Sequence, residues 1–229
     1  MPLVLGVDGC PGGWVGALVR VPPNAAATFA AWLRLPDAAA VLAVDSEAVG
    51  IDIPIGLPRA GPRGCDVAAR ARLPGRGSTV FPAPVRAVLG AHDYAEARAR
   101  SVAASGRSLS AQAWNIVAKI RDVDDALTPA DADRVVEVHP EVSFAEMAGR
   151  PLPPKRSTVG QAARVDALAS WIDAAAALRT GPARLRTDDA LDALAAAWSA
   201  ARWLAGTAEV LPGGPPERDS RGHPMRIVV

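Results

Sequence analysis

Two short apolar segments of the chain, "LVLGVDG" and "AVGIDIP", each place an aspartate directly after a glycine and an aliphatic residue. Their composition predicts two buried strands, and an unpaired carboxylate inside such a strand is costly, so Asp8 and Asp52 need a partner. Because side chains alternate between the faces of a strand, each aspartate shares a face with the glycine two residues before it. If the strands are parallel neighbours, both aspartates project from one face near the C-terminal strand ends. Open α/β sheets bind ligands at such ends.

The pattern around these segments predicts how the strands are connected. Three antiparallel strands, a short helix that begins at a proline, and a parallel strand together predict an α/β fold with a mixed sheet and flanking helices. At 229 residues the chain suits one domain, residues 1–229. The predicted strands cover residues 3–8, 14–21, 27–35, 48–57 and 134–139, with an edge strand in "MRIVV". The predicted helices cover residues 36–47, 108–127, 159–178 and 187–206, with a further short helix that starts at Pro140.

Residues 58–130 differ in composition from the segments that form the sheet. Proline, glycine and arginine are scattered among short helical patterns, and residues 59–86 contain six arginines against one acidic residue. We predict that this part is an arginine-rich, mostly helical insertion within the domain. Its excess of positive charge suits the phosphates of DNA or RNA, but it also suits the solubility of an alanine-rich surface.

Two later elements carry further carboxylates. The strand alternation places Glu137 on one face, and we interpret it as a third inward carboxylate. Asp189 and Asp192 are three residues apart on the last helix and therefore share a side. The helix dipole explains acidic residues in the first turn, where Thr187 is the expected N-cap, but it does not explain Asp192 one turn further along.

Carboxylates that converge from separate strands and a helix repel one another unless cations neutralise them. Hard oxygen ligands of this kind select Mg²⁺ or Mn²⁺. Two such ions about 3.5–4 Å apart would activate a water and stabilise both oxygens of an in-line phosphodiester displacement. The candidate catalytic residues are Asp8, Asp52, Glu137, Asp189 and Asp192. The candidate metal ligands are Asp8, Asp52, Glu137 and Asp192.

Three further residues are candidates for binding a substrate: Lys119, His139 and Arg76. Lys119 could contact a phosphate from its helix, although a solvated helix face explains it equally well. His139 suits a structural hydrogen bond as well as a general base or a phosphate contact. Arg76 belongs to the insertion, so it suits either a contact with a nucleic-acid phosphate or the solubility of an alanine-rich surface. Lys155 lies in a basic loop, where the same alternatives apply.

The chain resembles a known family nearly from end to end. The matching runs are "GVDGCPGGWV", "GIDIPIGLP", "STVFPAPVR", "SLSAQAWNIVAKI", "EVHPEVSFAEMAG" and "DDALDALAAAW". The order of its elements resembles the RNase H-like superfamily, and "DALDALAAA" is similar to the last catalytic helix of the Holliday-junction resolvases. The whole chain resembles the domain of unknown function 429 family, described as predicted nucleases of RNase H-like fold. The resemblance implies catalytic carboxylates at Asp8, at Asp52 (a glutamate in the resolvases), and at Asp189 or Asp192.

Composition excludes some classes of function. The formal net charge is only +1, so the chain as a whole has no signature of nucleic-acid or membrane binding. No apolar run approaches the ~20 residues of a membrane span, and the start of the chain has no signal-peptide pattern. Cys10 and Cys65 have no metal-site spacing. We therefore expect a cytoplasmic protein with no membrane partner, and the oligomeric state, a homodimer included, stays open.

Three functions remain in competition. The first is a metal-dependent nuclease that acts on DNA or RNA through the carboxylates above. The second is a phosphotransferase or nucleotide-binding protein of the actin and sugar-kinase type, because the "DGCPGGW" turn could contact a phosphate. The third is a non-catalytic RNase H-like module that binds a partner.

Overall fold

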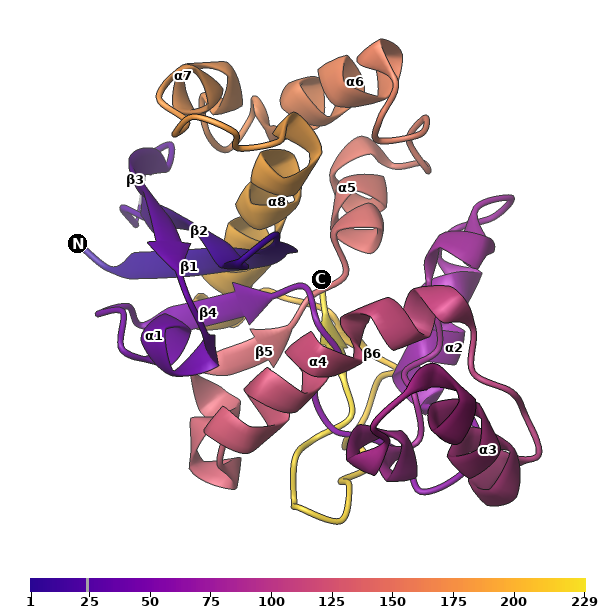
Figure 1. Cartoon of the computed structure of the whole chain (residues 1–229). Helices are drawn as coiled ribbons and strands as arrows, with labels where there is room; N and C mark the ends of the chain where they lie inside the picture. The colour runs from indigo at the N-terminus through magenta and orange to yellow at the C-terminus, as the bar shows by residue number, and fades with distance from the viewer. Residues whose placement is uncertain (24) are drawn as a thin grey trace.

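The computed structural model describes residues 1–23 and 25–229 and has a five-stranded mixed sheet at its centre (Figure 1). The strands are β1 (Leu3–Cys10), β2 (Gly13–Arg20), β3 (Thr28–Leu35), β4 (Ala48–Ile51) and β5 (Val135–Glu137). Their order in the sheet is β3-β2-β1-β4-β5; the first three strands pair antiparallel, whereas β4 and β5 run parallel to β1. The predicted α/β class, with antiparallel strands followed by parallel ones and with flanking helices, is confirmed.

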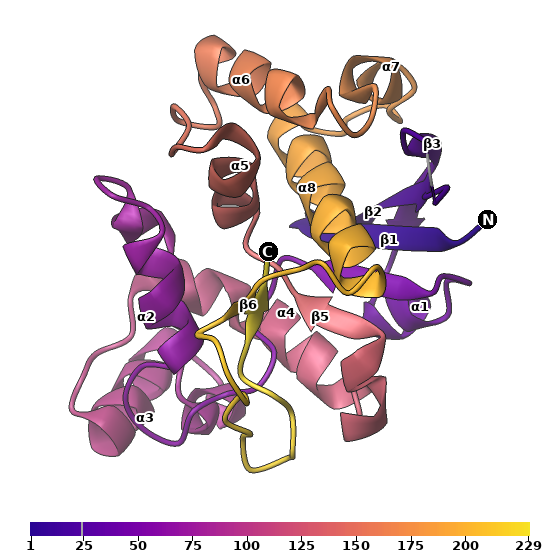
Figure 2. The same cartoon turned by 180° about the vertical axis from the view of Figure 1, so that it is seen from behind.

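On one face of the sheet α8 lies directly on β1 and β4, and three further helices pack around α8 (Figures 1 and 2). These helices are α5 (Pro140–Ala148), α6 (Thr158–Leu168), α7 (Ala174–Arg179) and α8 (Thr187–Leu204). A Cβ added to Gly6 would lie 2.0 Å from the carbonyl oxygen of Ala193, and one added to Gly50 would lie 2.3 Å from that of Ala196. Only glycine therefore lets the α8 backbone rest on the two strands, and this contact fixes the position of the α8 side chains relative to the strand ends.

The opposite face of the sheet packs against α1 (Ala38–Leu42) and α4 (Ala111–Ala126). Apolar side chains of β1 and β4 form a core there with residues of both helices, including Val41 and Ile120. Because α4 belongs to residues 58–130, part of the predicted insertion forms the second helical layer over the sheet. Residues 85–117 pack beside this layer around a smaller apolar cluster between α3 (Tyr94–Ser105) and α4. The earlier part of the segment, residues 65–80, packs in a separate cluster with the C-terminal strands.

The remaining elements lie at the edge of the sheet. They are α2 (Gly64–Ala71), α3 (Tyr94–Ser105), the 3₁₀ turns Gly77–Thr79, Arg86–Gly90 and Pro129–Asp133, and the short strands β6 (Val210–Leu211) and β7 (Ile227–Val228). The edge strand predicted in "MRIVV" is β7, which pairs antiparallel with β6. A parallel bridge between Val138 and Val228 also joins it to the main sheet just beyond β5.

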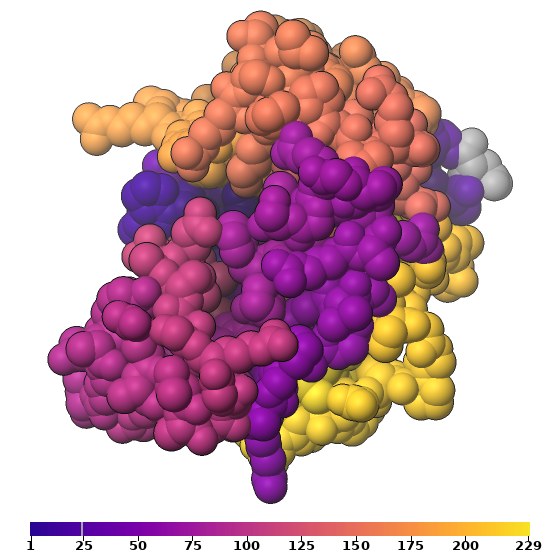
Figure 3. Space-filling model, turned by 90° about the vertical axis from the view of Figure 1, so that its right-hand side faces the viewer, coloured from indigo at the N-terminus to yellow at the C-terminus, as the bar shows by residue number. Residues whose placement is uncertain are grey.

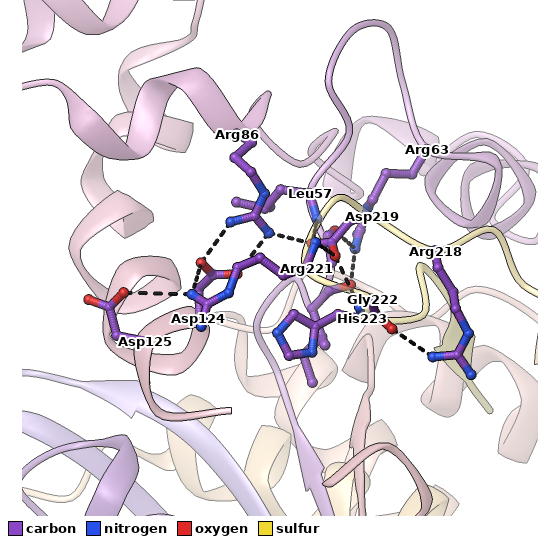
Figure 4. A network of polar contacts seen from close by, with 12 residues as sticks. Leu57, Arg63, Arg86, Asp124, Asp125, Arg218, Asp219, Arg221, Gly222 and His223 are labelled. Atoms are coloured by element: carbon purple, nitrogen blue, oxygen red, sulfur yellow. Dashed lines mark hydrogen bonds and ion pairs between the residues drawn. The ribbon is translucent and has the colours of Figure 1, made fainter. Parts of the chain in front are cut away.

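A polar network ties the C-terminal segment to the insertion (Figure 4). The carboxylate of Asp219 accepts hydrogen bonds from the backbone N–H groups of Leu57 and Arg221, at 3.0 and 2.8 Å, and pairs with Arg86. Arg86 and Arg221 both pair with Asp124 of α4, each at 2.8 Å. One buried carboxylate thus connects the loop after β4, the insertion and the C-terminal segment.

The structure corrects the extents of three predicted elements. The helix predicted over residues 36–47 is limited to α1, Ala38–Leu42, with Asp37 as its N-cap. The strand predicted over residues 48–57 ends at Ile51, and Pro54 has no N–H with which to continue the ladder. The helix predicted over residues 159–178 is divided into α6 and α7, because the side chain of Asp173 caps a new helix. No helix in the described part of the chain is long and apolar enough to cross a membrane.

Candidate functional site

A cavity of about 950 Å³ opens where β1, β4 and β5 end. Its walls come from these strand ends, from the insertion and from the loop between α5 and α6. Figure 3 shows a recess between the orange segment at the top and the purple and magenta insertion. Seven of the eight predicted site residues line the cavity, and Asp189 does not. The seven are Asp8, Asp52, Arg76, Lys119, Glu137, His139 and Asp192.

Three of these residues, Asp8, Asp52 and Asp192, form what we call the carboxylate cluster. Val7 and Ile51 are paired neighbours whose side chains pack on the α4 side of the sheet, so the aspartate after each of them lies on the α8 side. The N–H of Asp52 donates to the carbonyl of Val7 at 2.9 Å, which extends the parallel ladder to the aspartate itself. Asp192 is fully covered in the first half of α8. Two parallel strands and one helix thus deliver three carboxylates to one cavity.

Burial and mutual repulsion shift the pKa values of the carboxylate cluster upward. Burial, and then the charges of Asp52 and Asp192, raise the pKa of Asp8 well above its usual range. Burial raises the pKa of Asp52 to about 6 and the pKa of Asp192 to about 7, although the charge of Lys155 opposes both shifts. Carboxyl groups in this range take up protons close to neutral pH unless a cation displaces them.

Lys155 brings one positive charge into the carboxylate cluster. It comes from the loop between α5 and α6, and its ammonium pairs with Oδ2 of Asp192. Although burial opposes the shift, the charges of Asp192, Asp52 and Asp8 raise the pKa of Lys155. Within the described residues, Oδ1 of Asp192 is buried and has no hydrogen-bond partner. Asp192 therefore gives one oxygen to Lys155, and its other oxygen is unpaired among the described residues.

Glu137 lines the same cavity, but its carboxylate is already paired with another side chain. Both of its oxygens accept hydrogen bonds from Arg63 at 2.7 Å, and Oε2 also accepts one from the N–H of Ile55 at 2.7 Å. Arg63 pairs in turn with Asp66, and all three charged side chains are buried. In the sheet Glu137 is paired with Ile51, whose side chain packs on the face opposite α8. The structure thus places Glu137 in a buried ion network, apart from the carboxylate cluster.

The acidic residues in the first turn of α8 are engaged in ion pairs. The N-cap of α8 is Arg186, whose side chain pairs with Asp188 at 2.7 Å and lies 3.9 Å from Asp189. The expected cap, Thr187, is the first residue of the helix instead. Of the two aspartates that the sequence left open, the structure places Asp192 in the cavity and Asp189 outside it.

The three side chains predicted to bind a substrate differ in whether other residues of the protein already contact them. The ammonium of Lys119 lies 4.5 Å from the centre of the Trp14 ring and donates to the carbonyl of Gly13. His139 precedes α5, and within the described residues its buried Nδ1 has no partner; burial lowers its pKa, so the ring is neutral at pH 7. The guanidinium of Arg76 forms no hydrogen bond or ion pair with another described residue, and it remains available to an anion.

Several cavity residues were not predicted as parts of a site. Arg63 and Phe81 line the cavity, and Phe81 is 42% exposed although it is aromatic. Phe81 lies in "STVFPAPVR", a segment that carries the family resemblance but for which the sequence predicts no function. Gln112 and Asn115 line the cavity beside Lys119, as helical spacing along α4 allows. Loop residues have no periodicity, so the sequence does not predict that Lys155 or Phe81 lies in the same cavity as the carboxylates.

The carboxylate cluster fits a divalent cation by its chemistry, though not by its present side-chain positions. Within the described residues, no group of three or more His, Cys, Asp and Glu side chains is arranged to hold a metal ion. When its three aspartates are ionised, the cluster nevertheless carries more negative charge than Lys155 balances, and the unpaired Oδ1 of Asp192 is a buried hard oxygen. Uptake of Mg²⁺ or Mn²⁺ therefore requires the side chains of the cluster to turn toward the ion.

A family model described as "Protein of unknown function (DUF429)" matches residues 6–217. The chain belongs to this family. The match includes the carboxylate cluster, Lys155 and the whole insertion, so the site described above lies within the DUF429 region. Comparison with curated proteins and with solved structures gives no match. Membership of DUF429 names no reaction, and the function has to be argued from the site.

Proposed function

We propose that this DUF429 protein is a divalent-metal-dependent hydrolase of phosphodiester bonds in DNA or RNA. The observation that carries the proposal is the carboxylate cluster, in which Asp8, Asp52 and Asp192 line one cavity from two neighbouring parallel strands and one helix. Two buried carboxylates and a half-buried one at one place destabilise a fold unless they serve a ligand that needs them.

An RNase H-like fold is the finer part of this proposal. Three features support it. β1, β2 and β3 form an antiparallel meander, and β4 and β5 are added in parallel on the other side of β1. The last helix, α8, lies across β1 and β4. The candidate carboxylates follow the order that the resemblance implies: one on the first strand, one just after β4 and one on α8.

Asp8, Asp52 and Asp192 are the residues that would hold Mg²⁺ or Mn²⁺. Bound there, the cation would supply Lewis-acid stabilisation of the charge that develops on the phosphate. The protein's own groups supply the rest. Neutral His139 can accept a proton at Nδ1, and Lys155 holds Asp192 in place.

The rest of the cavity wall suits a polynucleotide. Arg76 and Lys119 offer positive charge to phosphates, and the side-chain amides of Gln112 and Asn115 can donate hydrogen bonds. Phe81 presents an exposed ring in the same wall, on which a base can stack. A polynucleotide can use both parts of the wall, because its phosphates contact the charged and amide side chains and its bases stack on the ring.

Cleavage of fluorescent single-stranded, duplex and branched DNA and RNA in the presence of Mn²⁺ tests the proposal. We expect cleavage by the wild-type protein and a loss of about 100-fold or more in Asp8→Asn and Asp192→Asn. Asp189→Asn, which changes the same residue type outside the cavity, should retain activity. Undiminished cleavage by Asp8→Asn would contradict the assignment. Transfer of phosphate from ATP without any cleavage would favour a phosphotransferase, and nucleic-acid binding without either reaction would favour a binding module.

A further inference from the structure

The proposed function gives Lys155 only the task of holding Asp192, but the place of this lysine in the carboxylate cluster points to a further role. Its ammonium pairs with Oδ2 of Asp192, although its side chain is anchored in the loop between α5 and α6 and is 36% exposed. A half-buried loop lysine can still reach solvent, so its position inside the cluster is a specific contact. Oδ1 of the same aspartate is left without a partner.

The charges around the cluster determine how many cations it can take. When a bound cation keeps all three aspartates ionised, Asp8, Asp52 and Asp192 carry three negative charges, and Lys155 carries one positive charge. Nearby, Glu141 pairs with Arg164 at 2.6 Å and Arg156 contacts Asp188 at 3.4 Å. Arg63 is shared between Glu137 and Asp66, so one further negative charge remains in the cavity wall. The net charge of the cluster with Lys155 is therefore −2, which one divalent cation balances and two would exceed.

We infer that the site binds a single divalent cation and that Lys155 takes the place of a second one, an inference that rests on the proposed function. Asp192 is then the shared group, with Oδ2 on the ammonium and Oδ1 left for the metal. The ammonium supplies a fixed positive charge to the phosphate beside the cation. This replaces the arrangement of two metal ions expected from the sequence with one metal ion and one lysine.

The number of bound ions tests the inference without depending on activity. Mn²⁺ titration of the full chain, followed by electron paramagnetic resonance and calorimetry, should give one tightly bound ion per wild-type chain. Lys155→Met keeps the length of the side chain but removes its charge. We expect this variant to bind a second Mn²⁺ or to bind the first more tightly, and to lose about 100-fold in cleavage rate. Lys155→Arg should recover part of that rate.

Arg150→Met is the matched control, because it removes an exposed charge close to the same loop but outside the cavity. It should leave both the stoichiometry and the cleavage rate unchanged. Two Mn²⁺ ions per wild-type chain with normal cleavage would overturn the role of Lys155 and leave the nuclease proposal standing. Faster cleavage by Lys155→Met would also overturn it, because the lysine would then only obstruct the metal. If the wild-type chain binds no Mn²⁺, the metal site itself fails.

Discussion

Asp52 holds a charge that costs the metal-free protein stability. Burial raises its pKa to about 6, above the ordinary aspartate value, so the ionised form is penalised in the folded state. The penalty is absent at low pH, where the group is protonated in both states, and it grows until the pH exceeds the folded-state pKa. The carboxylate therefore destabilises the fold near neutral pH, as expected of a group retained for function.

We predict that Asp52→Asn is more stable than the wild type by about 2 kcal/mol at about pH 8 in the presence of EDTA. The difference should vanish toward about pH 4. Urea unfolding at both pH values measures it, with the exposed Asp166→Asn as control. A variant less stable than the wild type at the higher pH would show that the attraction between Asp52 and the charge of Lys155 outweighs the cost of burial.

Arg63 illustrates the opposite case, a buried charge whose partners make it indispensable. It is 1% exposed and is shared between Glu137 and Asp66. Removing it leaves two buried carboxylates uncompensated, so Arg63→Ala should cost about 3–5 kcal/mol of unfolding free energy. Arg59→Ala, four residues earlier and exposed, should change stability by less than about 0.5 kcal/mol. Equal effects of the two substitutions in denaturant titrations would contradict the buried network.

The contact between α8 and the sheet depends on the absence of two side chains. A Cβ at Gly6 would lie 2.0 Å from the carbonyl oxygen of Ala193 and 2.1 Å from the amide nitrogen of Ala197, which are both backbone atoms and cannot move alone. Gly6→Ala should therefore displace α8 and cost more than about 3 kcal/mol. Gly64→Ala at the start of α2 meets its nearest atom at 3.4 Å and should be neutral or slightly stabilising.

Thermal unfolding and Mn²⁺ titration of both variants measure this dependence. Because α8 carries Asp192, the Gly6 variant should also bind Mn²⁺ more weakly, whereas Gly64→Ala should bind it normally. Normal stability of Gly6→Ala would mean that the helix is not held against the strand.

Strand periodicity was sufficient to place two of the three cluster carboxylates. Alternation within "LVLGVDG" and "AVGIDIP" predicts that Asp8 lies on the same strand face as Gly6, and Asp52 on the same face as Gly50. The parallel pairing of β1 with β4 places both aspartates on one face of the sheet. Helical spacing likewise indicated that Asp192 was not explained by the first turn of α8. Local patterns carry this information because each depends on one element alone.

Relations between elements could not be read from the sequence in the same way. Glu137 pairs with Ile51 rather than with Asp52, and a shift of one residue exchanges the faces of a strand. The position of Lys155 depends on a loop without periodicity, and the pairing of Glu137 depends on Arg63, 74 residues earlier. These contacts depend on strand register and on loop path, which only the whole fold determines.

The cavity exists because three distant parts of the molecule are held at fixed positions. Strand ends form one wall, the insertion a second and the loop between α5 and α6 a third. The polar network of Figure 4 fastens the insertion to the C-terminal segment, with Asp219 at its centre. The side chain of Asp219 is fully covered, so its partners have no water to replace it.

We predict that Asp219→Ala destabilises the whole molecule by about 3 kcal/mol at pH 7, because N–H groups and Arg86 lose a common acceptor. Although burial opposes the shift, the N–H groups of Leu57 and Arg221 hold the pKa of Asp219 below its usual value. A depressed pKa stabilises the fold above about pH 4, and this contribution is lost as the pH falls through the folded-state value. The difference between variant and wild type should therefore shrink in acid, which urea titrations from pH 7 downward would show.

Asp125→Asn, which changes a 71% exposed carboxylate beside the same network, should shift stability by less than about 0.5 kcal/mol at every pH. A penalty for Asp219→Ala that stays constant with pH would mean that shape, and not charge, makes this residue necessary.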